Sequence, residues 1–439
     1  MAGLQRPVGV PAETIGPAAA WRTVALFCLL YVFSFVDRLA LSLLISDIGS
    51  AFQMSDTEMG FLIGTSFSVV YAISGLPIAH WLDRANRKRI ILAGIFLWGS
   101  MTILSGFAPS FAFLAFCRAG VALGEAVLTP AAISMIADLF PHERRTLPTA
   151  LYASMATFMS VGGLAVSAAA LQAAQGLESQ LGMEAWRLTL VFVGLPSLLL
   201  AAIFAVAVRE PPRGHYDTDA DRSGGAGLGE FLKHAAVHIG FYAPLLIATA
   251  LFTIFLFGVV NWAPSIMART YGISMSEAGF LFGGLGAGVG LAAALFWPAL
   301  VGRLGRKSVH APLLIGLIAG AVLSLGVGVI APHAAELRLF LVGFSLVLFG
   351  GNAASMLLPL VMQSHTPPRM RASGMAVLML AQSLVGYGAG PVVVALLAAH
   401  WQGAPAGLAY GLSATAALAF PIAVAGYCLA RRAVGAAPR

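Results

Sequence analysis

Charged residues are scarce in this chain of 439 residues: Asp, Glu, Lys and Arg make up 10% of it, whereas hydrophobic residues make up 59%. A soluble domain carries about 25% charged residues, so this chain has too few to cover a water-exposed surface. The high apolar content also excludes an intrinsically disordered chain. The net charge of +7 is not gathered into a patch on a soluble fold, so no nucleic-acid partner is expected.

Cysteine is equally rare, with Cys28, Cys117 and Cys428 far apart in apolar stretches. No disulfide framework and no CxxC metal or redox site is therefore expected. The chain also has no H-E-x-x-H, no G-x-S-x-G and no G-x-x-x-x-G-K-[ST] pattern, which disfavours metalloprotease, esterase and ATP-driven mechanisms. We expect neither an enzyme nor a metal site.

Long apolar runs take up most of the sequence. A membrane-crossing helix needs about 20 mostly apolar residues. Twelve runs meet this requirement, at 21–46, 58–82, 89–107, 111–138, 148–172, 187–208, 239–268, 276–301, 308–330, 336–363, 372–399 and 405–430. The chain is predicted to be an all-α polytopic membrane protein whose 12 helices form two six-helix bundles.

The longest polar interval separates span six from span seven. Residues 209–238 hold Glu210-Pro211-Pro212-Arg213, several acidic residues and Gly224-Gly225, a composition typical of a flexible linker. We therefore expect an N-terminal tail at 1–20 without a cleaved signal peptide, a bundle at 21–208, a second bundle at 239–430 and a tail at 431–439.

Lys and Arg fall mostly on one side of the predicted spans. If the N-terminus is inside, 20 of the 25 lie in cytoplasmic segments, as the positive-inside rule requires. Both termini and the linker are predicted to be cytoplasmic. This bias also explains the basic net charge without an acidic partner.

The two halves repeat one another. Glu58-x-Gly60-Phe61-Leu62 recurs as Glu277-x-Gly279-Phe280-Leu281, and Gly124-Glu125-Ala126 aligns with Gly351-Asn352-Ala353. Parallel repeats of six spans bind substrates between the halves near the middle of the membrane, and they work by alternating access. Ser55 and Glu58, like Ser274 and Glu277, are spaced as capping boxes at helix starts.

The loop after span two carries a family resemblance. Ala79-x-x-x-Asp83-Arg84-x-x-Arg87-Lys88 resembles the G-x-L-x-D-R-x-G-R-K motif of the major facilitator superfamily, with Ala79 and Asn86 in place of its glycines. That resemblance implies a transporter in which spans 1, 4, 7 and 10 line a central cavity. It also suggests a gate latch at Asp83, with Asp138 in the same network, and Arg84, Arg87 and Arg144 are the neighbouring candidates. The alternative is that these cations serve only as topology signals.

Two further segments narrow the resemblance. Phe35-Val36-Asp37-Arg38 and Arg118-x-x-x-Ala122-x-Gly124-Glu125-Ala126 are similar to the spinster branch, except that Ala122 stands where Gly is usual. Animal members of this branch export sphingosine 1-phosphate and lysophospholipids, and bacterial members are thought to be proton-coupled. The resemblance implies a lipid-like or amphipathic cargo and a bacterial inner-membrane location.

Ionisable residues within the apolar spans are the sharpest physical signal. Each costs roughly 3 kcal/mol on insertion scales and should face a cavity and a partner. Arg118 and Glu125 lie seven residues apart on one helix, so each must find partners on other helices, and Asp37 is the expected neighbour of Arg118. We predict proton coupling at Asp37 and Glu125, with Arg38 and Arg118 as substrate or ion-pair residues. The alternative is a static ion-pair network.

The second half offers polar rather than charged candidates. Asn261, Asn352 and Tyr387 are predicted to contact substrate, and helix-to-helix bonding is an equal alternative for Asn352. The sequence thus predicts a monomeric, proton-coupled secondary transporter whose partners are membrane lipids and a small-molecule or lipid substrate. No cofactor is expected beyond the coupling proton. A proton-linked carrier of small organic anions, with Arg118 as carboxylate clamp, is the main alternative; a passive channel or a membrane enzyme would belong to other classes.

Overall fold

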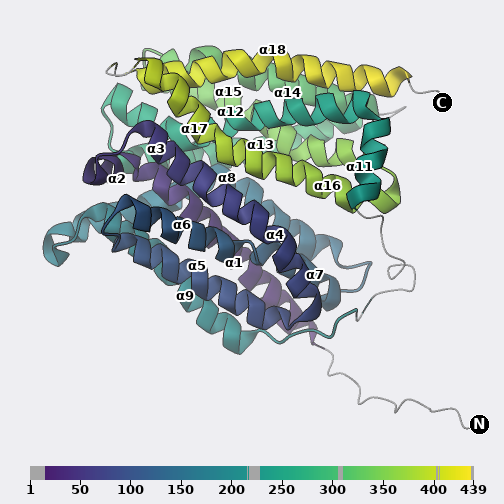
Figure 1. The fold of residues 1–439 in the computed structure, drawn as a ribbon, viewed down its shortest axis with the longest axis horizontal. Helices are drawn as coiled ribbons and strands as arrows, with labels where there is room; N and C mark the ends of the chain where they lie inside the picture. The colour runs from purple at the N-terminus through teal and green to yellow at the C-terminus, as the bar shows by residue number, and fades with distance from the viewer. Residues whose placement is uncertain are drawn as a thin grey trace, which may run out of the picture.

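Twelve helical stretches in the computed structural model are long and apolar enough to cross a membrane. The structure describes residues 15–214, 216, 228–304, 310–401, 404 and 406–436, and it contains no β-strand in these ranges. The helices form two bundles that lie side by side, one from each half of the chain (Figure 1). The predicted all-α, 12-span fold class is confirmed.

The N-terminal half contains nine α-helices and one π-helix in the described ranges. They are α1 (Pro17–Leu43), α2 (Ile45–Phe52), α3 (Asp56–Gly60), π-helix η1 (Phe61–Thr65), α4 (Ser66–Arg84), α5 (Arg87–Gly106), α6 (Phe111–Glu125), α7 (Leu128–Leu139), α8 (Thr146–Leu181) and α9 (Ala185–Ala207). The second predicted span is thus built from α3, η1 and α4. The fourth is α6 followed by α7, with a break at Ala126–Val127.

The C-terminal half repeats this pattern. Its elements are α11 (Leu228–Val237), α12 (Ile239–Tyr271), α13 (Met275–Leu304), α14 (His310–Ile330), η2 (Ala331–His333), α15 (Leu337–His365), η3 (Pro368–Met370), α16 (Arg371–Leu380), π-helix η4 (Ala381–Tyr387), α17 (Gly388–Ala398), η5 (Ala399–Trp401) and α18 (Gly407–Ala436). The predicted eleventh span combines α16, η4 and α17.

Two differences from the sequence prediction have local causes. Residues 228–237, expected to belong to a flexible linker, form α11, because Phe231 is buried with its ring 5.5 Å from that of Tyr242. Helix α8 continues to Leu181, past the predicted end at 172, until Gly182 takes a left-handed conformation with φ of 61°. The predicted span ends at 172 because residues 173–181 are more polar, but these residues still favour a helix. Both predicted capping boxes are present, at Ser55–Glu58 and at Ser274–Glu277.

The ends of the bundles are distinct. We call the end that holds Glu210–Gly214 and α11 the linker end, and the end that holds residues 44–55 and 272–274 the far end. Helix α18 finishes on the same side as α11, whereas α2 lies on the opposite side (Figure 1).

The halves approach each other closely near the far end. A Cβ added to Gly60 would lie 2.9 Å from the carbonyl oxygen of Pro391, and one added to Gly64 would lie 2.6 Å from that of Gly388. Only residues without side chains allow helical backbones this near to each other. Asp56 and Arg269 add a two-point ion pair between the halves, with both N–O distances 2.7 Å. Together these contacts close the far end in this structure.

Candidate functional site

Asp37 and Arg118 form a buried ion pair between α1 and α6. Their side chains are 5% and 3% exposed, and Arg118 Nη1 lies 3.0 Å from Asp37 Oδ1. Thr102 on α5 donates to the other carboxylate oxygen. Both oxygens of Asp37 are therefore engaged, by residues from two further helices.

Arg38 and Glu125 form a second ion pair beside the first. Arg38 Nε lies 2.6 Å from Glu125 Oε2, and Ser34 Oγ donates to the same oxygen at 2.8 Å. Ser34, Asp37 and Arg38 are spaced i, i+3 and i+4, so one face of α1 supplies all three. The seven-residue spacing of Arg118 and Glu125 lets α6 present one partner to each pair.

Three aromatic rings contact the guanidinium groups of the two pairs. The ring centroid of Phe67 lies 4.6 Å from the Arg118 guanidinium carbon and 4.8 Å from that of Arg38. Phe35 and Tyr71 also face Arg38, at 5.4 and 5.1 Å. Guanidinium groups are attracted to aromatic faces at these distances. Sequence reasoning missed Phe67 because one aromatic residue among 27 Phe gives no signal before its neighbours are known.

Three polar atoms in this region are buried without a hydrogen-bond partner among the described residues. They are Glu125 Oε1, Arg118 Nε and the hydroxyl of Tyr387. A buried polar atom without a partner costs roughly 1–3 kcal/mol. The site therefore retains unused capacity to bind a proton or a polar group.

The three predicted site residues of the C-terminal half make different contacts. Asn261 accepts a hydrogen bond from Ser42 Oγ at 2.6 Å, so it links α12 to α1 across the halves. Tyr387 packs its ring 5.7 Å from that of Phe67 and 4.9 Å from that of Phe257. Asn352 donates to the carbonyl of Leu348 within its own helix. The structure thus brings Tyr387 to the charged site, and it places Asn261 nearer the far end.

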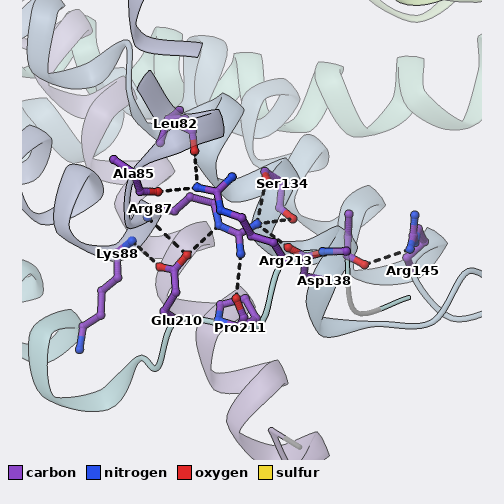
Figure 2. Close-up of polar contacts among 12 residues, drawn as sticks. Leu82, Ala85, Arg87, Lys88, Ser134, Asp138, Arg145, Glu210, Pro211 and Arg213 are labelled. Atoms are coloured by element: carbon purple, nitrogen blue, oxygen red, sulfur yellow. Dashed lines mark hydrogen bonds and ion pairs between the residues drawn. The ribbon is translucent and has the colours of Figure 1, made fainter. Parts of the chain in front are cut away.

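A second charged cluster lies at the linker end around Arg87. This side chain is 1% exposed and forms ion pairs with Asp138 and with Glu210, the latter at 2.8 Å. It also donates to Ser134 Oγ at 3.0 Å and to the carbonyl of Pro211 at 2.9 Å. Figure 2 shows how these groups from α7 and from the start of the linker converge on one guanidinium.

The first residues of the predicted flexible linker are held in this cluster. Arg213 donates to the carbonyls of Leu82 and Ala85, at the end of α4. The amide of Gly214 donates to Asp138 at 2.9 Å, and that of Lys88 donates to Glu210 at 2.7 Å. Glu210 and Arg213 were not among the predicted site residues, although opposite charges directly after span six were a usable signal.

Other predicted gating residues do not join the cluster. The side chains of Arg84 and Arg144 are exposed, and neither forms a hydrogen bond or ion pair with the parts of the chain that the structure describes. Asp83 belongs to α4, but its side chain lies outside the described residues. Of the five predicted gating residues, the structure joins Arg87 to Asp138.

Metal binding has no support in the described ranges: they contain no group of three or more His, Cys, Asp and Glu residues able to hold an ion. The acids of the two charged clusters are instead paired with arginines, in Asp37–Arg118, Arg38–Glu125, Arg87–Asp138 and Arg87–Glu210.

Known proteins share this architecture. A bacterial homolog to the human lysosomal transporter Spinster, solved in an inward-facing and unoccupied conformation, superposes with a TM-score of 0.81 and 26% sequence identity, covering 95% of this chain and 98% of that one. An MFS-type efflux pump of Mycolicibacterium smegmatis is 29% identical over 391 residues, 88% of this chain and 86% of that protein. Protein spinster homolog 1 of Homo sapiens is 30% identical over 222 residues, 50% of this chain but only 39% of that protein.

The family model of the Major Facilitator Superfamily matches residues 27–391, which include most of each half and both charged clusters. The fold, the 12 spans and the relatives agree with this match. The chain is therefore an integral membrane transporter, not an enzyme; it resembles the spinster branch, and it belongs to the major facilitator superfamily.

Proposed function

We propose that this transporter is proton-coupled and carries an amphipathic or lipid-like molecule by alternating access between its two halves. The observation that carries the proposal is the pair of buried ion pairs, Asp37–Arg118 and Arg38–Glu125, in which Glu125 Oε1 has no partner. Ionisable groups at this depth are functional by default in membrane proteins.

Glu125 is suited to take up the proton. Its Oε2 accepts from Arg38 and Ser34, whereas Oε1 is free to carry a hydrogen. Glu125 is also the last residue of α6, directly before the break that leads to α7. A change of angle at this break would move the carboxylate away from Arg38, and a carboxylate that loses its cation binds a proton more tightly.

Asp37 provides the second acidic group. It is held by Arg118 and Thr102, so its proton affinity also depends on how α1, α5 and α6 are arranged. The coupling proton would be the only non-protein component, and a single chain supplies the complete site. We propose that the protein works as a monomer among membrane lipids.

The cargo class rests on the resemblance to the spinster branch and on the composition of the site. Two guanidinium groups beside Phe67, Phe35 and Tyr71 suit a molecule with a polar head and an apolar body. A second candidate is a small organic anion, because Arg118 Nε has no partner and could bind a carboxylate.

The orientation follows from the positive charges. Figure 2 shows four basic residues together at the linker end: Arg87, Lys88, Arg145 and Arg213. The positive-inside rule assigns such an end to the cytoplasm. We propose that both termini are cytoplasmic and that the protein resides in a bacterial inner membrane. With this orientation, the contacts that hold the far end together support the proposal of an inward-facing state.

The test is uptake into proteoliposomes with an imposed pH gradient, screened over lysolipids, sphingoid bases and organic acids. Wild type should accumulate a cargo only when the gradient is present. Asp37→Asn and Glu125→Gln should lose gradient-driven accumulation, by tenfold or more, while keeping exchange of cargo across the membrane. Glu143→Gln removes an exposed acid and is the matched control.

An unchanged response to the gradient in both buried-acid variants would overturn proton coupling at this site. Accumulation of an organic acid, without movement of any lysolipid or sphingoid base, would replace the first cargo class with the second.

A further inference from the structure

Both π-helical segments in the described parts of the chain lie at one contact between the halves. The π-helix η1 (Phe61–Thr65) belongs to the N-terminal half, and η4 (Ala381–Tyr387) belongs to the C-terminal half. Thr65 Oγ1 donates to the carbonyl of Gly388 at 2.9 Å. A Cβ added to Gly64 would lie 2.9 Å from the carbonyl oxygen of Tyr387. Segments of π-helix are rare and occur frequently at functional sites.

Phe67 follows η1 by two residues and connects this contact to the buried charges. Its side chain is 2% exposed, and the same ring lies within 4.8 Å of the guanidinium carbons of both Arg38 and Arg118. One aromatic side chain thus contacts the cation of each ion pair. Arg118 Nη2 also donates to the backbone carbonyl of Arg38 at 3.4 Å, and in the described residues the ring of Phe67 is an aromatic contact common to both cations.

Tyr387 meets Phe67 from the other half. It is the last residue of η4, its ring lies 5.7 Å from that of Phe67 at an interplanar angle of 57°, and its hydroxyl is buried without a partner. The neighbouring Gly388 allows close approach, since a Cβ there would lie 3.1 Å from Cβ of Ser68. The ring of Phe67 therefore contacts both arginines in its own half and Tyr387 in the other half.

We propose that Phe67 is a positioning residue that couples the ionisation state of the two ion pairs to the contact between the halves, through Tyr387. This inference rests on the proposed proton-coupled function. When Glu125 takes up a proton, Arg38 loses its ionic partner, and the rings of Phe67, Phe35 and Tyr71 become its main remaining contacts. A shift of η1 against η4 changes the position of Phe67 relative to both arginines. By linkage, proton binding must then change the balance between contacting and separated halves to the same extent.

The test needs no cargo. Spin labels are placed at Ser179 and Ala335, two exposed far-end positions in different halves. Pulsed electron paramagnetic resonance in nanodiscs then measures the distance between the two labels, which reports the separation of the halves. We expect the distance distribution of wild type to shift with pH. Phe67→Leu keeps an apolar side chain but removes the aromatic face, so the midpoint should move by about 1 pH unit, equivalent to tenfold in proton affinity.

Two companion variants make the result specific. Phe67→Tyr keeps the aromatic face and should restore the wild-type midpoint. Phe257→Leu removes the other ring that packs on Tyr387, at 4.9 Å, and it should leave the midpoint within about 0.3 pH units because no arginine contact is recorded for Phe257 in the described residues. If Phe67→Leu does not yield folded protein, Phe67→Met takes its place.

The outcomes separate this inference from the proposed function. If Phe67→Leu titrates like Phe257→Leu while Asp37→Asn and Glu125→Gln abolish the pH response, Phe67 is not the coupling residue and proton coupling remains supported. If the buried-acid variants keep the wild-type pH response, the proposed function fails and the inference fails with it.

Discussion

At the scale of single residues, two acids and two bases balance one another within the apolar bundle. The Asp37–Arg118 contact could be anticipated from sequence, because an unpaired charge in an apolar span is costly and few partners are available. The pairing of Glu125 with Arg38, and the ring of Phe67 against both arginines, could not. These two sets of contacts depend on how each helix is rotated about its axis, and a single sequence does not specify this rotation.

Removing one member of a buried ion pair should lower the stability of the folded protein more than removing the charges of both members. Arg118→Met leaves Asp37 buried without a cation, and such changes cost roughly 3–5 kcal/mol. We expect the Asp37→Asn/Arg118→Met double variant to recover a large part of this loss in the thermal unfolding of the purified protein. A double variant whose loss equals the sum of the two single losses would show that the residues do not interact.

Arg87 should not be replaceable by lysine. Its planar guanidinium contacts Asp138, Glu210, Ser134 and the carbonyl of Pro211, and an ammonium group cannot match that geometry. Arg87→Lys should lower stability by roughly 1–3 kcal/mol, the cost of a buried acceptor without a donor. Arg84→Lys, at an exposed site, is the control and should unfold at the wild-type temperature. Equal melting temperatures for the two variants would mean that the cluster contributes nothing to stability.

At the scale of helices, apolar length predicted where the chain crosses the membrane but not how each span is built. Span two contains η1, span eleven contains η4, and span four breaks between α6 and α7. Hydropathy depends on composition along the chain, whereas π-helical turns and breaks depend on backbone hydrogen bonding and on neighbouring helices. Residues 228–237 were assigned to the linker for a related reason: their polar composition does not show that Phe231 is buried against Tyr242 on the next helix.

Gly64 offers a test of the contact between η1 and α17. A methyl group there would lie 2.6 Å from the carbonyl oxygen of Gly388, so Gly64→Ala should prevent the far end from closing fully. Ser42 is buried at the contact between the halves. In a background with Cys28, Cys117 and Cys428 replaced by Ala, maleimide labelling of Ser42→Cys should become several-fold faster. Gly75→Ala is the matched control, because a Cβ at Gly75 meets no atom within 4 Å. Equal labelling rates in the two variants would show that this contact does not close the far end.

At the scale of the whole molecule, the contacts that join the halves favour one access state. The internal repeat predicted two matched bundles, and the structure shows them side by side (Figure 1). Which end holds these contacts could not be predicted, because the apolar pattern of the spans is the same whichever end is closed. Here Asp56–Arg269, Ser42–Asn261 and Thr65–Gly388 connect the halves toward the far end.

Exchanging the charges of one such contact tests its role. Asp56→Arg sets two cations against each other and should shift the spin-label distances between Ser179 and Ala335 toward an open far end. The exchanged pair, Asp56→Arg with Arg269→Asp, should return most molecules to the closed state. Asp47→Asn, an exposed far-end change, should have no effect. Failure of the exchanged pair to restore closure would indicate that the ion pair follows closure rather than supporting it.

Proton uptake by Asp37 and Glu125 can be measured by infrared detection of protonated carboxyl groups as pH is lowered. Wild type should show a carboxylic-acid band that disappears in Glu125→Gln or Asp37→Asn. Its midpoint should differ by about 1 pH unit or more between wild type and Gly64→Ala, because the two populate different access states and one pH unit is a tenfold change in proton affinity. A band unaffected by both acid substitutions, or one with the same midpoint in both access states, would contradict proton coupling by these residues.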